Sequence, residues 1–199
     1  MTQPARPPSA RQEELLERAY RYVLEHGLAD LSLRPLAAAI GTSPRVLLFL
    51  FGSKDGLVRA LLARARADEL ALLDRAGHDR TRADLAAAVR TTWTWLAASE
   101  HHQLLTLWAQ AYARSLTEPN GPWSGFAAQT VTDWLAVLAA AQPPRRRRSP
   151  AGAAERSLAL SVLRGALLDL LATGDIDRTT AAVDQHLAAI RRQRLRSGP

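Results

Sequence analysis

The sequence predicts an all-α protein, with a small N-terminal helical head followed by a larger C-terminal helical bundle. Three observations predict this fold class. Apolar residues recur three and four positions apart along most of the 199 residues. No stretch shows the period-two alternation that is typical of a half-buried strand. Glycine, serine and proline interrupt the helical pattern at the positions where helices usually begin and end.

The composition narrows the class of partner. The net charge is +7, and Lys54 is the only lysine, so arginine carries nearly all the positive charge. A basic surplus favours nucleic acid or an anionic surface, although a coding bias towards alanine and arginine would produce the same charge. The chain has no cysteine, which excludes disulfides, thiolate chemistry and cysteine-ligated zinc. Without an apolar signal segment or an apolar run long enough to span a bilayer, we expect a cytoplasmic protein with no membrane partner.

The first two helices follow a proline-rich segment. Residues 1–10 predict a flexible arm. From Arg11 the apolar positions predict a helix that ends at Gly27, where glycine is the usual residue after a helix. A second, short helix then runs to Ile40, and Gly41 stops it.

Two serines mark the starts of the next two helices. The third helix extends from Pro44 to Phe51, with Ser43 as its expected N-cap and proline in its first turn. Ser53 is the expected N-cap of a long connecting helix over residues 54–75.

The remaining residues are predicted to form the bundle. Trp93 falls in register with the apolar positions around it, so we expect it in the core. The proline- and glycine-rich segment around Arg145–Arg148 predicts a solvated linker, and residues 195–199 a tail. Helices are expected over 82–99, around Leu104 to Tyr112, from Trp123 to about Gln142, over 153–172 and over 176–192.

The second and third helices, joined by "GTS", fit a helix-turn-helix, whose second helix enters the DNA major groove. Arg45 suits a guanine edge or a phosphate, and Val46 suits a thymine methyl group. Lys54 lies at the start of the next helix, where its charge and the free backbone N–H groups suit a phosphate. The full set of candidate DNA-binding residues is Arg34, Thr42, Ser43, Pro44, Arg45, Val46, Leu48, Phe49 and Lys54.

Most of this N-terminal segment, "LLERAYRYVLEHGLADLSLRPLAAAIGTSPRVLLFLFGSKDGLVRAL", resembles the DNA-binding domain of TetR/AcrR-family transcriptional regulators. "FGSKDGLV" is its most specific block, and "LRGALLDLLATGD" resembles the penultimate helix of the same family, whereas residues 80–150 contain no matching motif. The resemblance implies an all-helical homodimer in which an effector repositions two DNA-binding heads. The implied parts are a helix-turn-helix domain over 11–53, a connecting helix over 54–75, and a ligand-binding and dimerisation domain over 76–194.

The predicted recognition helix departs from the family pattern. The family usually has a tyrosine and a histidine or tyrosine shortly before the Phe-Gly pair, but here those positions are Leu48 and Leu50, with Phe49 between them. We expect Leu47, Leu50 and Phe51 in the core and at least one of Leu48 and Phe49 on the outside, because five consecutive apolar residues cover more than one helix face. Two readings remain open. Either the helix reads DNA through Arg45 and apolar contacts, or DNA binding is weakened or lost in a ligand-binding or interaction protein of the same fold.

Aromatic residues of the predicted bundle are candidates for an effector site, since ligand pockets are mostly apolar and aromatic. For each of them, packing in the core is the competing interpretation. The implied effector is an unidentified small molecule of apolar or aromatic character. The candidate lining residues are Trp95, Trp108, Tyr112, Trp123, Phe126 and Trp134.

The last two predicted helices carry more apolar surface than one core can cover. A helix that is apolar on more than one face needs a second partner. Helices 153–172 and 176–192 from two subunits would form a four-helix dimer interface, the alternative being a deeply buried helix within one subunit.

The sequence contains no motif for catalysis. It has no Gly-rich phosphate loop, no nucleophile elbow and no metal-ligand spacing, so we expect neither an enzyme nor a cofactor or metal. The prediction is a dimeric, ligand-responsive regulator, a repressor that binds double-stranded DNA at a pseudo-palindrome with half-sites about one helical turn apart.

Overall fold

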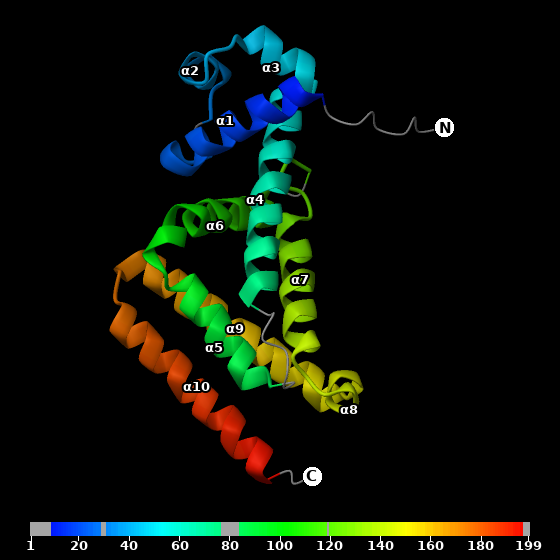
Figure 1. The fold of residues 1–199 in the computed structure, drawn as a ribbon, viewed down its shortest axis with the longest axis vertical. Helices are drawn as coiled ribbons and strands as arrows, with labels where there is room; N and C mark the ends of the chain where they lie inside the picture. Colours follow the sequence, from blue (N-terminus) through cyan, green and yellow to red (C-terminus); the bar gives the residue numbers. More distant parts are fainter. Residues whose placement is uncertain (1–8, 29–30, 77–83, 119, 197–199) are drawn as a thin grey trace.

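The computed structural model describes residues 9–28, 31–76, 84–118 and 120–196 of the chain. Within these residues the chain forms ten α-helices and one short 3-10 helix, and none of them is in a strand. The all-α prediction is therefore confirmed. Figure 1 shows a small head at one end and a larger body at the other, with one long helix running from the first into the second.

The head consists of three helices mounted on the first half of this long helix. They are α1 (Ala10–His26), α2 (Leu33–Ala39) and α3 (Pro44–Phe51), and the long helix is α4 (Lys54–Ala76). Both α1 and α3 pack directly on α4, and α2 packs between them (Figure 1). The head has a fully buried leucine and alanine core that all four helices supply: Leu15, Ala19, Leu36, Leu47, Leu57 and Leu61.

The body surrounds the second half of α4. Its helices are α5 (Leu85–Leu96), η1 (Ser99–His101), α6 (His102–Thr117), α7 (Phe126–Ala140), α8 (Pro144–Arg148), α9 (Pro150–Thr173) and α10 (Ile176–Arg196). Helix α10 packs against α5 and α9, and α6 packs against α7 (Figure 1). Because α4 belongs to both parts, the buried residues of head and body form one contiguous cluster. A displacement of α4 by the body therefore reaches the head.

The predicted linker at Arg145–Arg148 was wrong, since Pro144–Arg148 forms the short helix α8. Arg147 donates hydrogen bonds to the last carbonyl groups of α7, at Ala139 (2.7 Å) and Ala140 (3.0 Å). Arg146 pairs with Glu155 of α9, which raises the pKa of the guanidinium. Two arginines of the run thus stabilise the corner between α7 and α9, because the carbonyls at a helix end lack helical partners.

The ends of the chain also differ from the predictions. Helix α1 begins at Ala10, the last residue of the predicted arm, and residues 1–8 of that arm lie outside the described residues. Helix α10 continues to Arg196, so the first two residues of the predicted tail are helical, and residues 197–199 lie outside the description.

No single helix in the described part of the chain is both long and apolar enough to cross a membrane. Helices α2 and α3 reach that length and composition only as a pair, and the pair is bent by 103°.

Candidate DNA-binding surface and effector site

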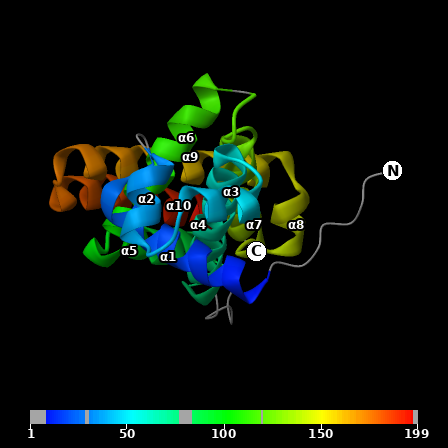
Figure 2. The same ribbon diagram turned by 90° about the horizontal axis from the view of Figure 1, so that it is seen from above.

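Helices α2 and α3 form a helix-turn-helix at the far end of the head. Gly41 occupies the turn with φ +70°, a left-handed conformation that glycine adopts without strain. The turn is closed by a hydrogen bond from the Thr42 N–H to the Ala37 carbonyl (2.9 Å). Seen from above in Figure 2, α2 and α3 lie over the rest of the molecule. The turn therefore presents α3 on the outer end of the head.

The start of α3 follows the predicted capping pattern. The N–H of Val46 donates to the Ser43 hydroxyl (3.3 Å), and Pro44 occupies the first helical turn. Serine accepts one of the N–H groups that lack a helical partner, and proline costs nothing there because its missing N–H would be unpaired in any case. This local chemistry orients Arg45 and Val46, which are both exposed, away from the head.

Helix α3 divides its apolar residues between the core and the outside. Leu47 is 1% exposed, whereas Leu48 is 42% and Phe49 is 84% exposed. Leu50 and Phe51 are half-buried and pack against the core. The predictions that these last two residues and Leu47 pack inwards, and that at least one of Leu48 and Phe49 faces outwards, are confirmed.

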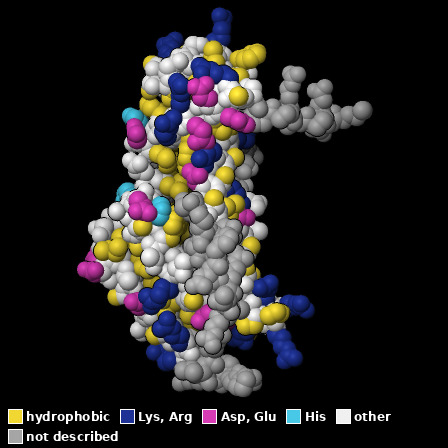
Figure 3. Space-filling view, viewed as in Figure 1, with side chains coloured by type: hydrophobic (Ala, Val, Ile, Leu, Met, Phe, Trp, Pro, Cys, Tyr) yellow, Lys and Arg dark blue, Asp and Glu magenta, His cyan; other side chains and the backbone are white. Residues whose placement is uncertain are grey.

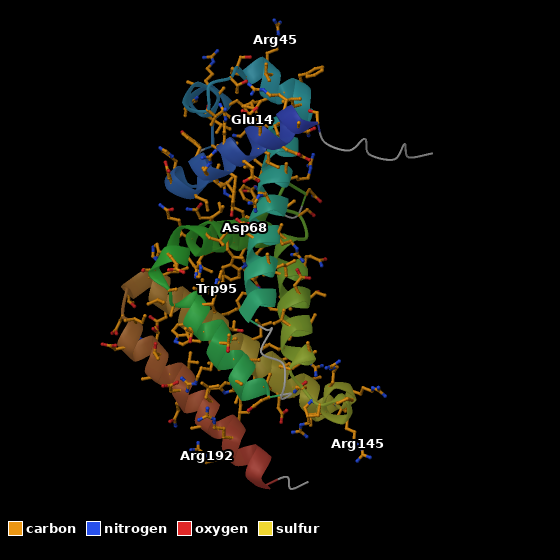
Figure 4. The ribbon with its side chains drawn as sticks, viewed as in Figure 1. Glu14, Arg45, Asp68, Trp95, Arg145 and Arg192 are labelled. Carbon is orange, nitrogen blue, oxygen red and sulfur yellow. The ribbon has the colours of Figure 1, made fainter. Side chains whose placement is uncertain are left out.

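Basic side chains accompany this exposed face. Arg34, Arg45 and Lys54 are exposed, and none of them forms an ion pair with a described residue. Arg45 points away from the molecule at the top of Figure 4. Figure 3 shows other Lys and Arg side chains beside hydrophobic ones at the same end. By contrast, Arg18 of α1 pairs with Glu14 (2.6 Å).

The start of α4 depends on a glycine whose role the sequence reasoning missed. The Gly56 N–H donates to the Ser53 hydroxyl (3.0 Å), and a Cβ at Gly56 would lie 2.0 Å from the Phe51 carbonyl oxygen. Only glycine lets α3 and α4 meet this closely. The signal was a glycine inside the first turn of a predicted helix, where it is otherwise unfavourable. The tight junction places Lys54 beside the end of the recognition helix.

The candidate effector residues do not form one group. Trp108 and Tyr112 lie one helical turn apart on α6, with ring centroids 5.1 Å apart. Trp108 and Phe126 both line a small apolar cavity of about 10 Å³ between α4, α6 and α7, which has room for about one water molecule. The structure therefore brings Trp108, Tyr112 and Phe126 into one region of the body.

The other three candidates have separate surroundings. Trp95 is half-buried and packs on His101 (4.4 Å between ring centroids), so it does not line this cavity. Trp123 and Trp134 are buried core residues, as is Trp93, whose predicted place in the core is confirmed. The sequence reasoning also missed Arg164 of α9, whose Nη1 donates to the Tyr112 hydroxyl (3.1 Å). An arginine in the middle of the leucine-rich part of α9 was the available signal.

Polar contacts of described residues connect the α1 region to α6 of the body and to α4. The Leu28 N–H, just after α1, donates to the side-chain oxygen of Gln110 on α6 (3.2 Å). Arg64 of α4 pairs with Glu17 of α1 and with Asp68, and lies over the Tyr20 ring (4.9 Å). Burial, followed by the nearby Asp68 carboxylate, raises the pKa of Tyr20 well above its usual value. Because Gln110 lies between Trp108 and Tyr112 in the sequence, a movement of this part of α6 reaches the head directly.

Sequence comparison gives one match within the head. Residues 15–61 match the family model for bacterial regulatory proteins of the tetR family. This range covers most of α1, the whole helix-turn-helix and the start of α4. No protein of curated function matches the chain in sequence.

Solved structures share the fold over most of the chain. A transcriptional regulator from Rhodococcus sp. Rha1 has a TM-score of 0.75 at 20% identity, over 92% of this chain and 96% of its own. A TetR transcription regulator from Haloarcula marismortui has a TM-score of 0.69 at 19% identity, over 90% and 97%. The multidrug binding protein EbrR, complexed with imidazole, has a TM-score of 0.66 at 24% identity, over 90% and 89%. At these identities the similarity demonstrates a common fold.

Proposed function

Because this chain is a member, through residues 15–61, of the TetR family of bacterial regulatory proteins, we propose that it is a dimeric, ligand-responsive repressor. It is a regulator and not an enzyme, and we propose that it acts in the cytoplasm on a pseudo-palindromic operator. The observation that carries the proposal is the outer face of α3. There an exposed Arg45 without an ion pair among the described residues lies beside the exposed Leu48 and Phe49.

The candidate residues divide into two roles on DNA. Arg45, Val46, Leu48 and Phe49 lie on the outer face of α3 and contact base edges, with the apolar side chains against thymine methyl groups. The other candidates, Arg34, Thr42, Ser43, Pro44 and Lys54, lie around this face and contact or flank the phosphate backbone. These contacts would replace those of the tyrosine and of the histidine or tyrosine that the family usually has in the recognition helix.

Replacing Arg45 by alanine is expected to weaken operator binding by about 1–3 kcal/mol, since a bidentate contact to a guanine edge is lost. Binding to unrelated duplex should change much less. Fluorescence anisotropy on both duplexes measures the difference. Arg21→Ala is the matched control, because Arg21 is exposed on α1 and outside the candidate set. Equal losses on both duplexes would make Arg45 a phosphate contact.

Replacing Lys54 by alanine is expected to weaken binding to every duplex alike. One phosphate contact fewer should reduce the slope of log K against log salt by about 0.9. Anisotropy titrations at several salt concentrations give the slope directly. A slope unchanged from that of the wild-type protein would remove Lys54 from the interface.

The effector is proposed to act through α6 and α4. The structural relative EbrR is described as a multidrug binding protein complexed with imidazole and with proflavin. In this chain Trp108 and Tyr112 flank Gln110, which holds the loop after α1. An effector that displaces α6 would therefore change the spacing of the two heads. If the effector binds only the conformation with the altered spacing, it increases the population of the form that does not bind the operator.

Dimerisation is proposed through α9 and α10. One face of α9 packs on the body through Leu163 and Leu167, while Leu158 and Leu168 are exposed on another. A Cβ added at Gly165, between these exposed leucines, would meet nothing within 4 Å. Ile176 of α10 is exposed beyond the end of this helix. A second copy related by a twofold axis would cover this apolar surface.

The proposal as a whole is tested by anisotropy on the DNA immediately upstream of the gene, with unrelated duplex as competitor. A competitor-resistant complex with two subunits per site is expected. If the protein binds no duplex selectively, including duplexes enriched from a random pool, the repressor function is wrong. The exposed apolar face of α3 would then belong to a ligand-binding or interaction protein.

A further inference from the structure

Arg164 is a half-buried cation that forms no ion pair with a carboxylate among the described residues. It extends from α9 towards α6, where its Nη1 donates to the Tyr112 hydroxyl (3.1 Å) and its guanidinium carbon lies 5.0 Å from the centre of the Tyr112 ring. Its Nε and Nη2 are inaccessible to solvent and have no hydrogen-bond partner. Buried donors are almost always paired, and a buried charge without a counter-ion is strongly unfavourable. This arrangement needs an explanation.

Arg164 can be compared with other arginines of this chain that lie over aromatic rings. Within the described residues, arginine lies over an aromatic ring at three places. Arg64, over Tyr20, pairs with two carboxylates, and Arg114, over Trp123, pairs with Glu118. Arg164 has the same geometry over Tyr112, but no carboxylate of the described residues pairs with it. At both of the other places, the arginine that lies over a ring is also paired with a carboxylate.

The unpaired polar groups around Arg164 are all hydrogen-bond donors. The Trp108 ring lies 5.1 Å from the Tyr112 ring, and its Nε1 is also buried without a partner. The Tyr112 oxygen accepts from Arg164, so its own hydrogen is available to a further acceptor. A ligand that completes these bonds must supply acceptors, and one negative charge would balance the single guanidinium.

A second subunit does not provide this acceptor. The unpaired nitrogens of Arg164 have no contact with solvent in a single subunit, so a partner that docks on the exposed face of α9 does not reach them. The group must enter the body itself. The adjoining cavity, which Trp108 also lines, holds about 10 Å³, far less than the roughly 300 Å³ of a ligand pocket. Entry therefore requires α6 to move away from α9 or α4.

We propose that Arg164, Tyr112 and Trp108 form the binding site for the carboxylate of an aromatic or long-chain acid, which is the effector. The site rests on the proposed function, because it gives the effector of the repressor its chemical class. Arg164 and the Tyr112 hydroxyl bind the carboxylate, and the apolar residues between α6 and α7 bind the remainder of the molecule. Opening of α6 for this ligand moves Gln110 and, through it, the loop after α1.

The test compares acids with neutral molecules of the same shape. The probes are 1-naphthoate against 1-naphthamide and dodecanoate against dodecanol, with cationic proflavin as a third class. Quenching of tryptophan fluorescence and the shift in Tm report binding. One or both acids should bind at least about tenfold more tightly than their neutral counterparts, as a charge-assisted hydrogen bond predicts. Arg164→Met should abolish this preference, and Tyr112→Phe should reduce it.

Two controls separate the site from other effects of charge. Arg90→Met removes an exposed arginine of α5 and should leave the acid preference unchanged. Without ligand, Arg164→Met should not lower Tm, because it removes an uncompensated charge, whereas Arg64→Met should lower it by leaving two carboxylates without their partner.

The proposal is overturned if neither acid is preferred over its neutral counterpart, or if Arg164→Met keeps the preference. It is also overturned if Arg164→Met lowers Tm as much as Arg64→Met does, since Arg164 would then be a structural residue. Operator binding measured with the same samples separates this site from the repressor function. Acid preference without selective operator binding contradicts the repressor function alone, and normal operator binding without acid preference contradicts the site alone. An acid that binds but leaves the operator complex intact overturns the assignment of the acid as effector.

Discussion

Replacing Leu168 by glutamate is expected to convert the protein into monomers and to weaken operator binding strongly. Leu168 is 51% exposed on the free face of α9, and the twofold axis of the proposed dimer would bring two such glutamates into one apolar interface. Juxtaposed like charges cost several kcal/mol, which weakens the dimer on the order of 100-fold or more. Operator affinity should fall on the order of 100-fold as well, since each monomer then binds a half-site alone.

Analytical ultracentrifugation and anisotropy measure these two effects on the same sample. Leu116→Glu is the matched control, because Leu116 is also an exposed leucine, 66% accessible, but lies on α6. It should leave both the mass and the operator affinity unchanged. A dimeric Leu168→Glu protein would exclude this face of α9 as the interface, and the apolar surface there would need another partner.

Two adjacent leucines of the recognition helix are expected to respond in opposite ways. Leu47→Ala should destabilise the protein by about 2–5 kcal/mol, since it opens a cavity in a fully packed core. Leu48→Ala should change stability by less than about 0.5 kcal/mol, because Leu48 lies on the surface. Its effect should appear instead as weaker operator binding. Urea unfolding and anisotropy separate the two properties.

The outcome decides what the apolar face of α3 does. If Leu48→Ala keeps full operator affinity, Leu48 is not part of the recognition surface. Replacing thymine by uracil in the operator removes only a methyl group and tests the same apolar contacts from the DNA side. If uracil weakens operator binding by the wild-type protein but not by Leu48→Ala or by Phe49→Ala, the contact with the methyl group belongs to that side chain.

Much of the head follows from rules that operate over one or two helical turns. Serine caps, proline in a first turn and glycine after a helix predicted the ends of α1 and α3, and the structure confirms them at Ser43, Pro44 and Gly27. The same local reasoning failed at Pro144–Arg148, where four arginines suggested a solvated linker. That segment is a helix because Arg146 and Arg147 find partners on α9 and α7, which are neighbours in space only.

The candidate sites were predictable to different degrees. Arg45 and Lys54 could be named from the sequence, because a helix-turn-helix assigns roles by position along the chain. Which of the six aromatic candidates share one site could not be decided from the sequence, since tryptophan suits a core and a pocket alike. Arg164 could not be identified from the sequence for a related reason. An arginine becomes a candidate for ligand binding only when its burial and its lack of a carboxylate partner are known, and both depend on packing between α6 and α9.

The sequence alone was sufficient for the all-α class, the helix-turn-helix and the surplus of apolar surface on α9, because periodicity and capping are properties of neighbouring residues. It was insufficient for the exposure of Phe49, the separation of Trp95 from Trp108, and the unpaired charge of Arg164. Helix α3 shows why. Its apolar residues extend around more than one face, so its pattern does not say which of them face inwards. The packing of α2 and α4 against it buries Leu47 and leaves Phe49 outside.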